Sequence, residues 1–108
     1  MTMRFPIAFL AFVLFALPAR ADRIDGDWCG SGGKHFRIDG SDIRTPAGTL
    51  TTGDYSRHFF HYVVPAGDPD AGQTIDMALQ SEELLFLRRT SGGVTGPEEE
   101  WRRCQVTS

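Results

Sequence analysis

From residue 24 onward, apolar residues come in short runs, and glycine, proline or polar turn residues separate one run from the next. In residues 34–39 and 73–80, the large apolar side chains fall on every second position. This period of two is typical of a strand that buries one face. No long stripe with a period of 3.6 residues occurs, so the pattern predicts an all-β domain built from many short strands.

The turn residues divide this part of the chain into seven or eight strands. Residues 57–64 are β-branched and aromatic and are apolar on both faces, so we expect them in mid-sheet or against a pocket. Residues 81–89 also suit a short helix, but their limited length between turn signals favours a hairpin. The predicted strands are 24–29, 34–39, 42–44, 49–52, 57–64, 73–80, 84–89 and 98–106.

Strands joined in order by short turns most simply form an antiparallel meander, and closing it into a small barrel removes the exposed edges. The first predicted strand contains Trp28 and Cys29, and the last contains Trp101 and Cys104. Because the chain has two cysteines, one intramolecular bridge is available. We expect a Cys29–Cys104 disulfide between neighbouring first and last strands. Free thiols or a redox pair are the alternatives, although redox pairs usually have Cys-x-x-Cys spacing.

The first 21 residues have the three parts of a secretory signal peptide, namely the basic Arg4, the apolar stretch 5–17 and the small-residue site 19–21. The apolar stretch is shorter than the roughly 20 residues that a membrane span needs. We expect cleavage after Ala21, with an uncleaved anchor as the alternative. The predicted product is one soluble domain, residues 22–108, without a membrane span. Its location is periplasmic or secreted, in an oxidising compartment that permits the disulfide.

Removal of Arg4 and Arg20 leaves 11 − 2 = 9 basic residues against 14 acidic ones, a net charge of −5. Such a charge argues against nucleic acid and anionic membranes as partners. It is compatible with a basic protein partner and equally with simple solubility.

The segment Gly26-Asp27-Trp28 resembles the Gly-x-Trp motif on the first strand of lipocalins. In that family an arginine from the last strand packs over this tryptophan, and Arg102 or Arg103 is placed for that role. The resemblance covers two short motifs in a chain about half as long as a lipocalin, and it implies a barrel with a mouth rather than a particular ligand. The two tryptophans are therefore expected to be structural, with a ligand-stacking pair as the alternative.

The loop 31–35, Ser-Gly-Gly-Lys-His, shows a fainter resemblance to the Ser-Gly-x-x-Tyr loop of periplasmic C-type lysozyme inhibitors, which are also small exported β-barrels. Here His35 stands in place of the tyrosine, and the loop lies much earlier in the chain. The resemblance implies a protein-binding loop, and a plain turn is the alternative.

No catalytic or metal-binding motif is complete. The loop 30–34 lacks the first glycine and the final Ser/Thr of a phosphate-binding loop, and there is no Gly-x-Ser-x-Gly elbow. His58 and His61 are three apart on one strand and point to opposite faces, so they and His35 do not supply the converging ligands of a zinc site. We expect no enzymatic activity, no metal and no cofactor. Residues 98–100 are expected to pair with nearby arginines across strands.

The sequence therefore favours an exported non-enzymatic binding module, with two readings. The first is a protein-binding or envelope-structural module, of which a lysozyme-inhibitor-like protein is one form. The second is a carrier of a small apolar ligand, which needs an interior of about 300 Å³ or more. The candidate binding residues are Ser31, Lys34 and His35 for the first reading, and Phe59, Phe60, His61 and Tyr62 for the second.

We expect the barrel interior to be filled by its own side chains, which favours the first reading over the carrier. The residues expected to fill it are Phe36, Ile38, Phe60, Tyr62, Ile75, Met77, Leu79 and Phe86.

Overall fold

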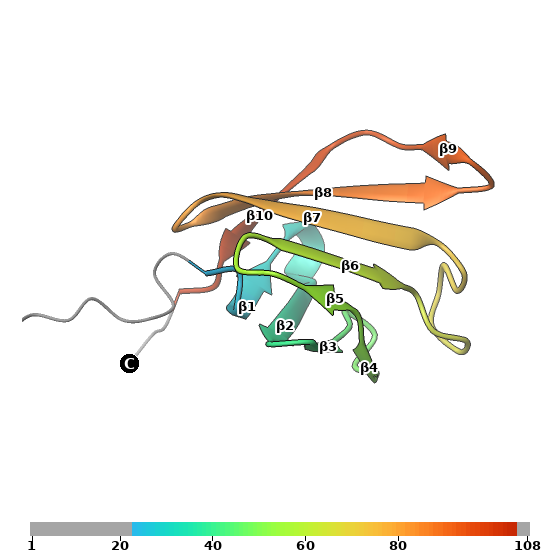
Figure 1. The fold of residues 1–108 in the computed structure, drawn as a ribbon, viewed down its shortest axis with the longest axis horizontal. Coiled ribbons are helices and arrows are strands. Elements are labelled where there is room, and N and C mark those ends of the chain that lie inside the picture. Colours follow the sequence, from blue (N-terminus) through green and yellow to red (C-terminus); the bar gives the residue numbers. More distant parts are fainter. Residues whose placement is uncertain (1–22, 106–108) are drawn as a thin grey trace, which may run out of the picture.

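The computed structural model describes residues 23–105 as an all-β domain with a single antiparallel sheet (Figure 1). The predicted signal peptide and Val106, at the end of the last predicted strand, lie outside the described residues. A 3₁₀ turn, η2 (Ser31–Gly33), follows the first strand. The strands are β1 (Gly26–Cys29), β2 (His35–Asp39), β3 (Asp42–Arg44), β4 (Leu50–Thr52), β5 (Asp54–Tyr55), β6 (Phe59–Val63), β7 (Thr74–Ser81), β8 (Leu84–Ser91), β9 (Val94–Thr95) and β10 (Glu99–Arg103).

Each of the predicted strands overlaps one observed strand, and the structure adds the two-residue strands β5 and β9. The hairpin predicted within residues 81–89 is confirmed, because β7 and β8 pair antiparallel with Ser81 opposite Leu84. Within residues 23–105, no helix is long and apolar enough to cross a membrane.

The sheet runs in the order β4-β3-β2-β1-β10-β8-β7-β6-β5, so the first and last strands of the chain are neighbours. The predicted adjacency is confirmed by the register of β1 on β10, which places Trp28 opposite Arg103. The two ends of this order, β4 and β5, are consecutive in the chain. Because β4 pairs with β3 and β5 pairs with β6, the short segment 50–55 links both ends of the sheet into a nearly closed barrel.

Gly53 is the residue at which this segment changes partner. A Cβ atom here would lie 2.8 Å from the ring of Phe60 and 2.8 Å from Cβ of Tyr62, closer than carbon atoms pack. The Gly53 amide donates to the carbonyl oxygen of Ser41 at 2.9 Å, which holds the crossing point to the β2–β3 turn. The absence of a side chain therefore lets the segment cross between the two ends of the sheet.

The interior of the barrel is filled by its own side chains, as expected. Phe86 is an exception: the structure places it on the outer face, while its neighbours Leu85 and Leu87 point inward. Leu79 is partly buried against the core. The buried apolar residues are Ile24, Trp28, Phe36, Ile38, Ile43, Phe60, Tyr62, Val64, Ile75, Met77, Leu85, Leu87 and Trp101.

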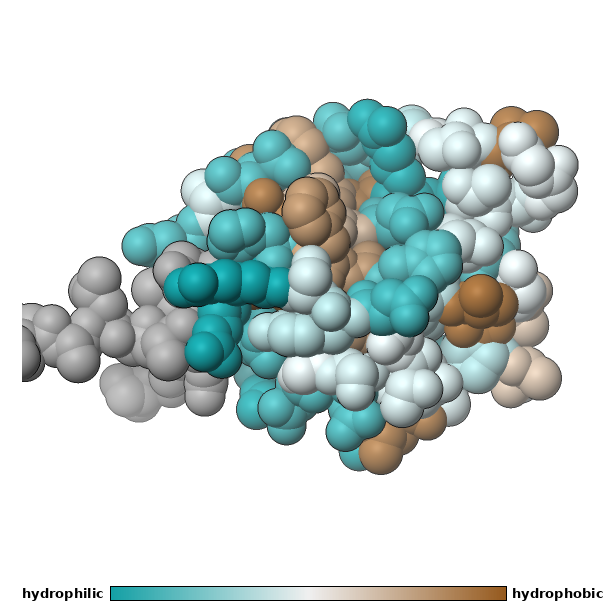
Figure 2. Space-filling model, viewed as in Figure 1, coloured by the Kyte–Doolittle hydropathy of each residue, from teal (hydrophilic) through white to brown (hydrophobic). Residues whose placement is uncertain are grey.

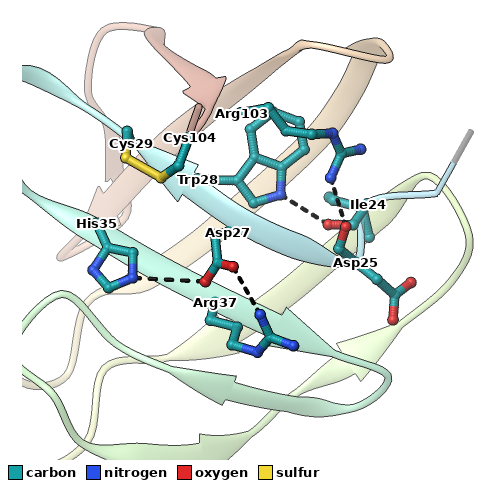
Figure 3. Close-up of polar contacts among 9 residues, drawn as sticks. All are labelled: Ile24, Asp25, Asp27, Trp28, Cys29, His35, Arg37, Arg103 and Cys104. Atoms are coloured by element: carbon teal, nitrogen blue, oxygen red, sulfur yellow. Dashed lines mark hydrogen bonds and ion pairs between the residues drawn. A yellow bond between two sulfur atoms is a disulfide. The ribbon is translucent and has the colours of Figure 1, made fainter. Parts of the chain in front are cut away.

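One end of the barrel, which we call the closed end, is held by Trp28 and Arg103 (Figure 3). The guanidinium carbon of Arg103 lies 4.3 Å from the Trp28 ring centroid, so Arg103 rather than Arg102 takes the position that the lipocalin resemblance implied. The indole nitrogen of Trp28 donates to the carbonyl oxygen of Ile24 at 2.9 Å. The predicted Cys29–Cys104 disulfide is confirmed, with Cα atoms 5.0 Å apart.

Arg103 also ties the ends of the domain together through backbone carbonyl groups. It donates to Asp25 at 2.6 Å, to Arg23 at 2.8 Å and, across the β7–β8 turn, to Glu82 at 2.6 Å. Gly26 has φ of 124°, and a Cβ atom there would lie 2.7 Å from Nη1 of Arg103. The glycine of the Gly-x-Trp segment therefore leaves room for the guanidinium group.

Candidate functional site

The end of the barrel opposite the Trp28–Arg103 contact is formed by loops. Because successive strands are antiparallel, the β7–β8 turn at the closed end places the connections 30–34, 45–49, 64–73 and 96–98 at the other end. Side chains from the first three of these loops surround two adjoining hollows. We call this end the open end.

The two hollows share Lys34, Asp70 and Arg89 and so form one depression, which we call the open-end cleft. The smaller hollow has a volume of about 220 Å³ and a mainly apolar lining. The larger has a volume of about 430 Å³ and a mainly polar lining. The smaller is also lined by Pro46, Ala47, Tyr62, Val64, Asp68 and Pro69, and the larger by Ser31, Glu99, Glu100 and Trp101.

An ion pair forms the boundary between the apolar core and the cleft. Arg89 follows Leu87 at the next inward position of β8, and its guanidinium group donates to Glu99 at 2.7 and 3.3 Å. The Trp101 indole donates to the same carboxylate at 3.2 Å. Burial alone would raise the pKa of Glu99, but these hydrogen bonds outweigh it and lower the pKa. Arg89 also lies 3.7 Å from Asp70, so its charge is balanced inside the cleft.

A second polar cluster fixes the loops that form the cleft wall. The buried hydroxyl of Thr45 donates to Asp68 at 2.7 Å, and the hydroxyl of Thr49 donates to the other carboxylate oxygen. These bonds join the turn 45–49 to the loop 64–73, although 19 to 23 residues separate the partners in the chain. The wall is therefore built in advance rather than assembled around a ligand, as is usual for binding sites.

Polar groups of the cleft that stay unpartnered among the described residues include those of Tyr62 and Lys34. Tyr62 is 5 % exposed, and no group within residues 23–105 hydrogen-bonds to its hydroxyl. Burial raises the pKa of Tyr62 to about 12, so the hydroxyl keeps its proton at neutral pH. Lys34, the single lysine of the chain, forms no hydrogen bond or ion pair with a side chain in the described range.

Of the residues predicted for binding, the structure brings Ser31, Lys34 and Tyr62 together in the open-end cleft. His35 lies elsewhere, on the outer face of β2, with its Nε2 atom 3.7 Å from Asp27. Figure 3 shows this pair on the side of β1 away from Trp28. The predicted loop surface 31–35 is therefore divided between the cleft and the outside of the barrel.

The mouth predicted from β6 does not form. Adjacent residues of a strand face opposite sides, so Phe60 and Tyr62 point into the core while Phe59 and His61 point outward. Phe59 is 59 % exposed, and His61 hydrogen-bonds to Asp76 at 2.6 Å on the outer face. The apolar character of β6 on both faces thus reflects a buried inner face and an exposed outer face, and the four side chains do not line one mouth.

Phe59 lies in a second depression, on the outside of the barrel, which we call the outer groove. Phe59 of β6, Ala78 of β7 and Phe86 of β8 are in register, and the small Ala78 leaves a hollow of about 370 Å³ between the two rings. Figure 2 shows apolar side chains over this part of the molecule, between hydrophilic ones. The rim includes the ion pair Arg88–Glu98, with an N–O distance of 2.7 Å.

The predicted cross-strand ion pairs are confirmed for Arg88–Glu98 and Arg89–Glu99. Arg102 instead pairs with Glu100 on its own strand, at 3.5 Å. Among residues 23–105, no three His, Cys, Asp or Glu side chains are grouped so that they could hold a metal ion.

Sequence reasoning missed most of the cleft, including Pro46, Val64, Asp70, Arg89 and Glu99. One signal was available for Arg89 and Glu99. Each continues the inward, every-second-residue pattern of its strand beyond the last apolar position, which places a charge at the rim of the barrel.

Comparisons with protein-family models, with curated proteins and with solved structures find no match to this chain. The resemblances to lipocalins and to lysozyme inhibitors therefore rest on short motifs, and membership of either family stays a prediction.

Proposed function

We propose that this chain is an exported, non-enzymatic binding module that holds a protein partner in the open-end cleft. The observation that carries the proposal is the position of the free space. The barrel interior is filled with apolar side chains, and a pre-formed cleft with fixed walls lies at one end. Ser31, Lys34 and Tyr62, which the sequence had singled out, line it.

The shape of the cleft favours a protein segment over an enclosed apolar ligand. A carrier needs about 300 Å³ or more of largely apolar space, whereas the apolar hollow measures about 220 Å³ and continues into a polar one. A protruding peptide segment carries both apolar and polar groups and suits such a surface. A purely structural role in the envelope would leave the unpartnered groups of the cleft without a use.

Affinity capture from periplasmic extract or culture fluid tests the proposal. The tag is attached at the C-terminus, because Arg103, the last residue of β10, lies at the closed end, opposite the cleft. Lys34→Glu is the cleft variant. Arg37→Glu makes the same charge change on the outer face of β2, and Phe59→Ser changes the outer groove. We expect a partner that is lost with Lys34→Glu and kept with both other variants.

Three outcomes would contradict the proposal. Loss of the partner with Phe59→Ser, but not with Lys34→Glu, would move the binding site to the outer groove. Absence of any partner at micromolar concentration would remove protein binding. A small apolar molecule retained by the exported protein in native mass spectrometry would favour the carrier.

A further inference from the structure

We propose that the group bound in the open-end cleft is the C-terminal end of a partner chain, with a free carboxylate beside a compact apolar side chain. This inference rests on the proposed function and names the chemistry of the partner. It is carried by the hydrogen-bonding groups that the cleft leaves unused and by the size and lining of its smaller hollow.

The charged groups around the smaller hollow are almost all engaged with one another. Asp68 accepts two threonine hydroxyl groups, and Asp70 lies 3.7 Å from Arg89, which is itself held by Glu99. Glu100, on the polar side, pairs with an arginine of its own strand. The carboxylates therefore have partners already, and a cationic ligand would have to compete with them.

The unused groups of the smaller hollow are hydrogen-bond donors. They are the ammonium group of Lys34 and the hydroxyl of Tyr62, and both side chains line this hollow. A protonated phenol donates one hydrogen bond and an ammonium group donates three, whereas a carboxylate only accepts. A bound carboxylate can accept from both donors and gives the Lys34 ammonium group, whose charge acts on Glu99 without an ion pair, a direct partner.

The rest of the hollow is apolar and small. Pro46, Ala47, Val64 and Pro69 line it, and its volume of about 220 Å³ suits one compact side chain rather than a longer apolar ligand. At a chain end, the carboxylate and the last side chain share one Cα atom, so both can enter the same small hollow. An internal Asp or Glu has no apolar side chain so close to its carboxylate.

Titration of the exported chain with short peptides tests the inference. Trp101 lines the larger hollow and reports binding by fluorescence, and calorimetry gives the affinity. The probes are acetyl-Gly-Ser-Gly-Leu with a free carboxylate, its C-terminal amide, the peptide ending in Gly, and acetyl-leucine alone. We expect the free acid to bind, and the amide to bind about tenfold more weakly or worse, because it loses a charge-assisted hydrogen bond. The peptide ending in Gly should also lose about tenfold, for want of a buried side chain.

Variants locate the binding. Lys34→Met should weaken binding of the free acid about tenfold, whereas Lys34→Arg, which keeps the charge, should retain most of it. Tyr62→Phe removes only the unpartnered hydroxyl and should weaken binding without lowering stability. Arg37→Met on the outer face of β2 is the control and should change nothing. Lys34 is exposed, so a folding defect is not expected to obscure its variants.

Equal binding of acid and amide, or no effect of Lys34→Met, would overturn the carboxylate assignment. Acetyl-leucine binding as tightly as the peptide would replace the chain end by a free carboxylic acid. A captured partner that is lost with Lys34→Glu, in the absence of any peptide binding, would overturn this inference and leave the proposed function standing. If neither the capture nor the titration detects binding, both this inference and the proposed function are contradicted.

Discussion

Replacing Arg103 by Met is the sharpest test of how the closed end is held. The methionine keeps an unbranched apolar stem but removes the guanidinium group. That group stacks on Trp28 and donates to three backbone carbonyl groups. All of these contacts join the last strand to the start of the domain or to the β7–β8 turn, so the substitution loosens the closed end at several points at once.

The expected cost follows from the burial of each contact. The cation–π contact with Trp28 is worth about 0.5–2 kcal/mol. The part-buried hydrogen bond to the Asp25 carbonyl has a charged donor and contributes about 1.5–3 kcal/mol. The hydrogen bonds to the carbonyl groups of Arg23 and Glu82 are exposed, so they contribute little to the free energy of unfolding, because water replaces the lost donor. The sum is about 2–5 kcal/mol, a large part of the roughly 5–15 kcal/mol that stabilises a domain.

Urea denaturation followed by tryptophan fluorescence measures this loss as a change in the free energy of unfolding. The matched control is Arg102→Met, one residue earlier, where the side chain is 65 % exposed and pairs with Glu100 at 3.5 Å. An exposed pair of this kind contributes about 0–1 kcal/mol. If the two variants agree within about 0.5 kcal/mol, a margin typical of surface substitutions, then Arg103 does not hold the closed end and the reasoning is wrong.

Three further predictions concern the covalent tie, the barrel closure and acid stability. Replacing Cys29 and Cys104 by Ser frees a loop of 75 + 1 = 76 residues and should lower the free energy of unfolding by about 4–4.5 kcal/mol in the chain-entropy model, with reduced wild-type protein as the check. Gly53→Ala should cost about 1–3 kcal/mol in thermal unfolding, as overpacking does, because its Cβ has no room at the crossing. Burial would raise the pKa of Asp25, but the Tyr55 hydroxyl and a backbone amide lower it, so stability should fall as pH drops below about 4, and Tyr55→Phe should flatten this acid loss.

Much of the barrel could be predicted from the sequence, because the signals were local. Residues 34–39 and 73–80 alternate cleanly, and both became strands with the expected buried face. The pairing of Cys29 with Cys104 needed no more than two cysteines and a closed meander. Glycine and proline marked the turns in the right places because they supply backbone conformations that other residues avoid.

It was harder to predict which residues of an apolar run point into the barrel. The run 84–87 is Leu-Leu-Phe-Leu. Because it contains no polar position, the sequence does not show whether its first and third or its second and fourth residues point inward. Phe86 was expected inside, but the register of β8 on β7 places it opposite Ala78 on the outer face, while Leu85 and Leu87 are buried. The same ambiguity in β6 placed Phe59 and Tyr62 in one expected mouth, although they face opposite sides.

The barrel closure and the cleft depend on contacts between distant segments, which no local pattern records. The strand β5 has two residues and exists because Gly53 lets the chain move from β3 to β6. Likewise, Asp68 accepts hydrogen bonds from the hydroxyl groups of Thr45 and Thr49 across the open end, and these bonds fix the cleft wall.

The two ends of the barrel divide stability and binding between them. At the closed end, the disulfide and Arg103 join segments from the beginning and end of the domain, so substitutions there affect the whole fold. At the open end, the side chain of Lys34 is exposed and forms no hydrogen bond or ion pair with the described residues. Lys34→Met should therefore change ligand affinity while leaving the free energy of unfolding within about 0.5 kcal/mol of wild type, as for other surface substitutions. A larger loss would mean that the loop 30–34 supports the fold, and the unpartnered ammonium group could then no longer be read as a binding group.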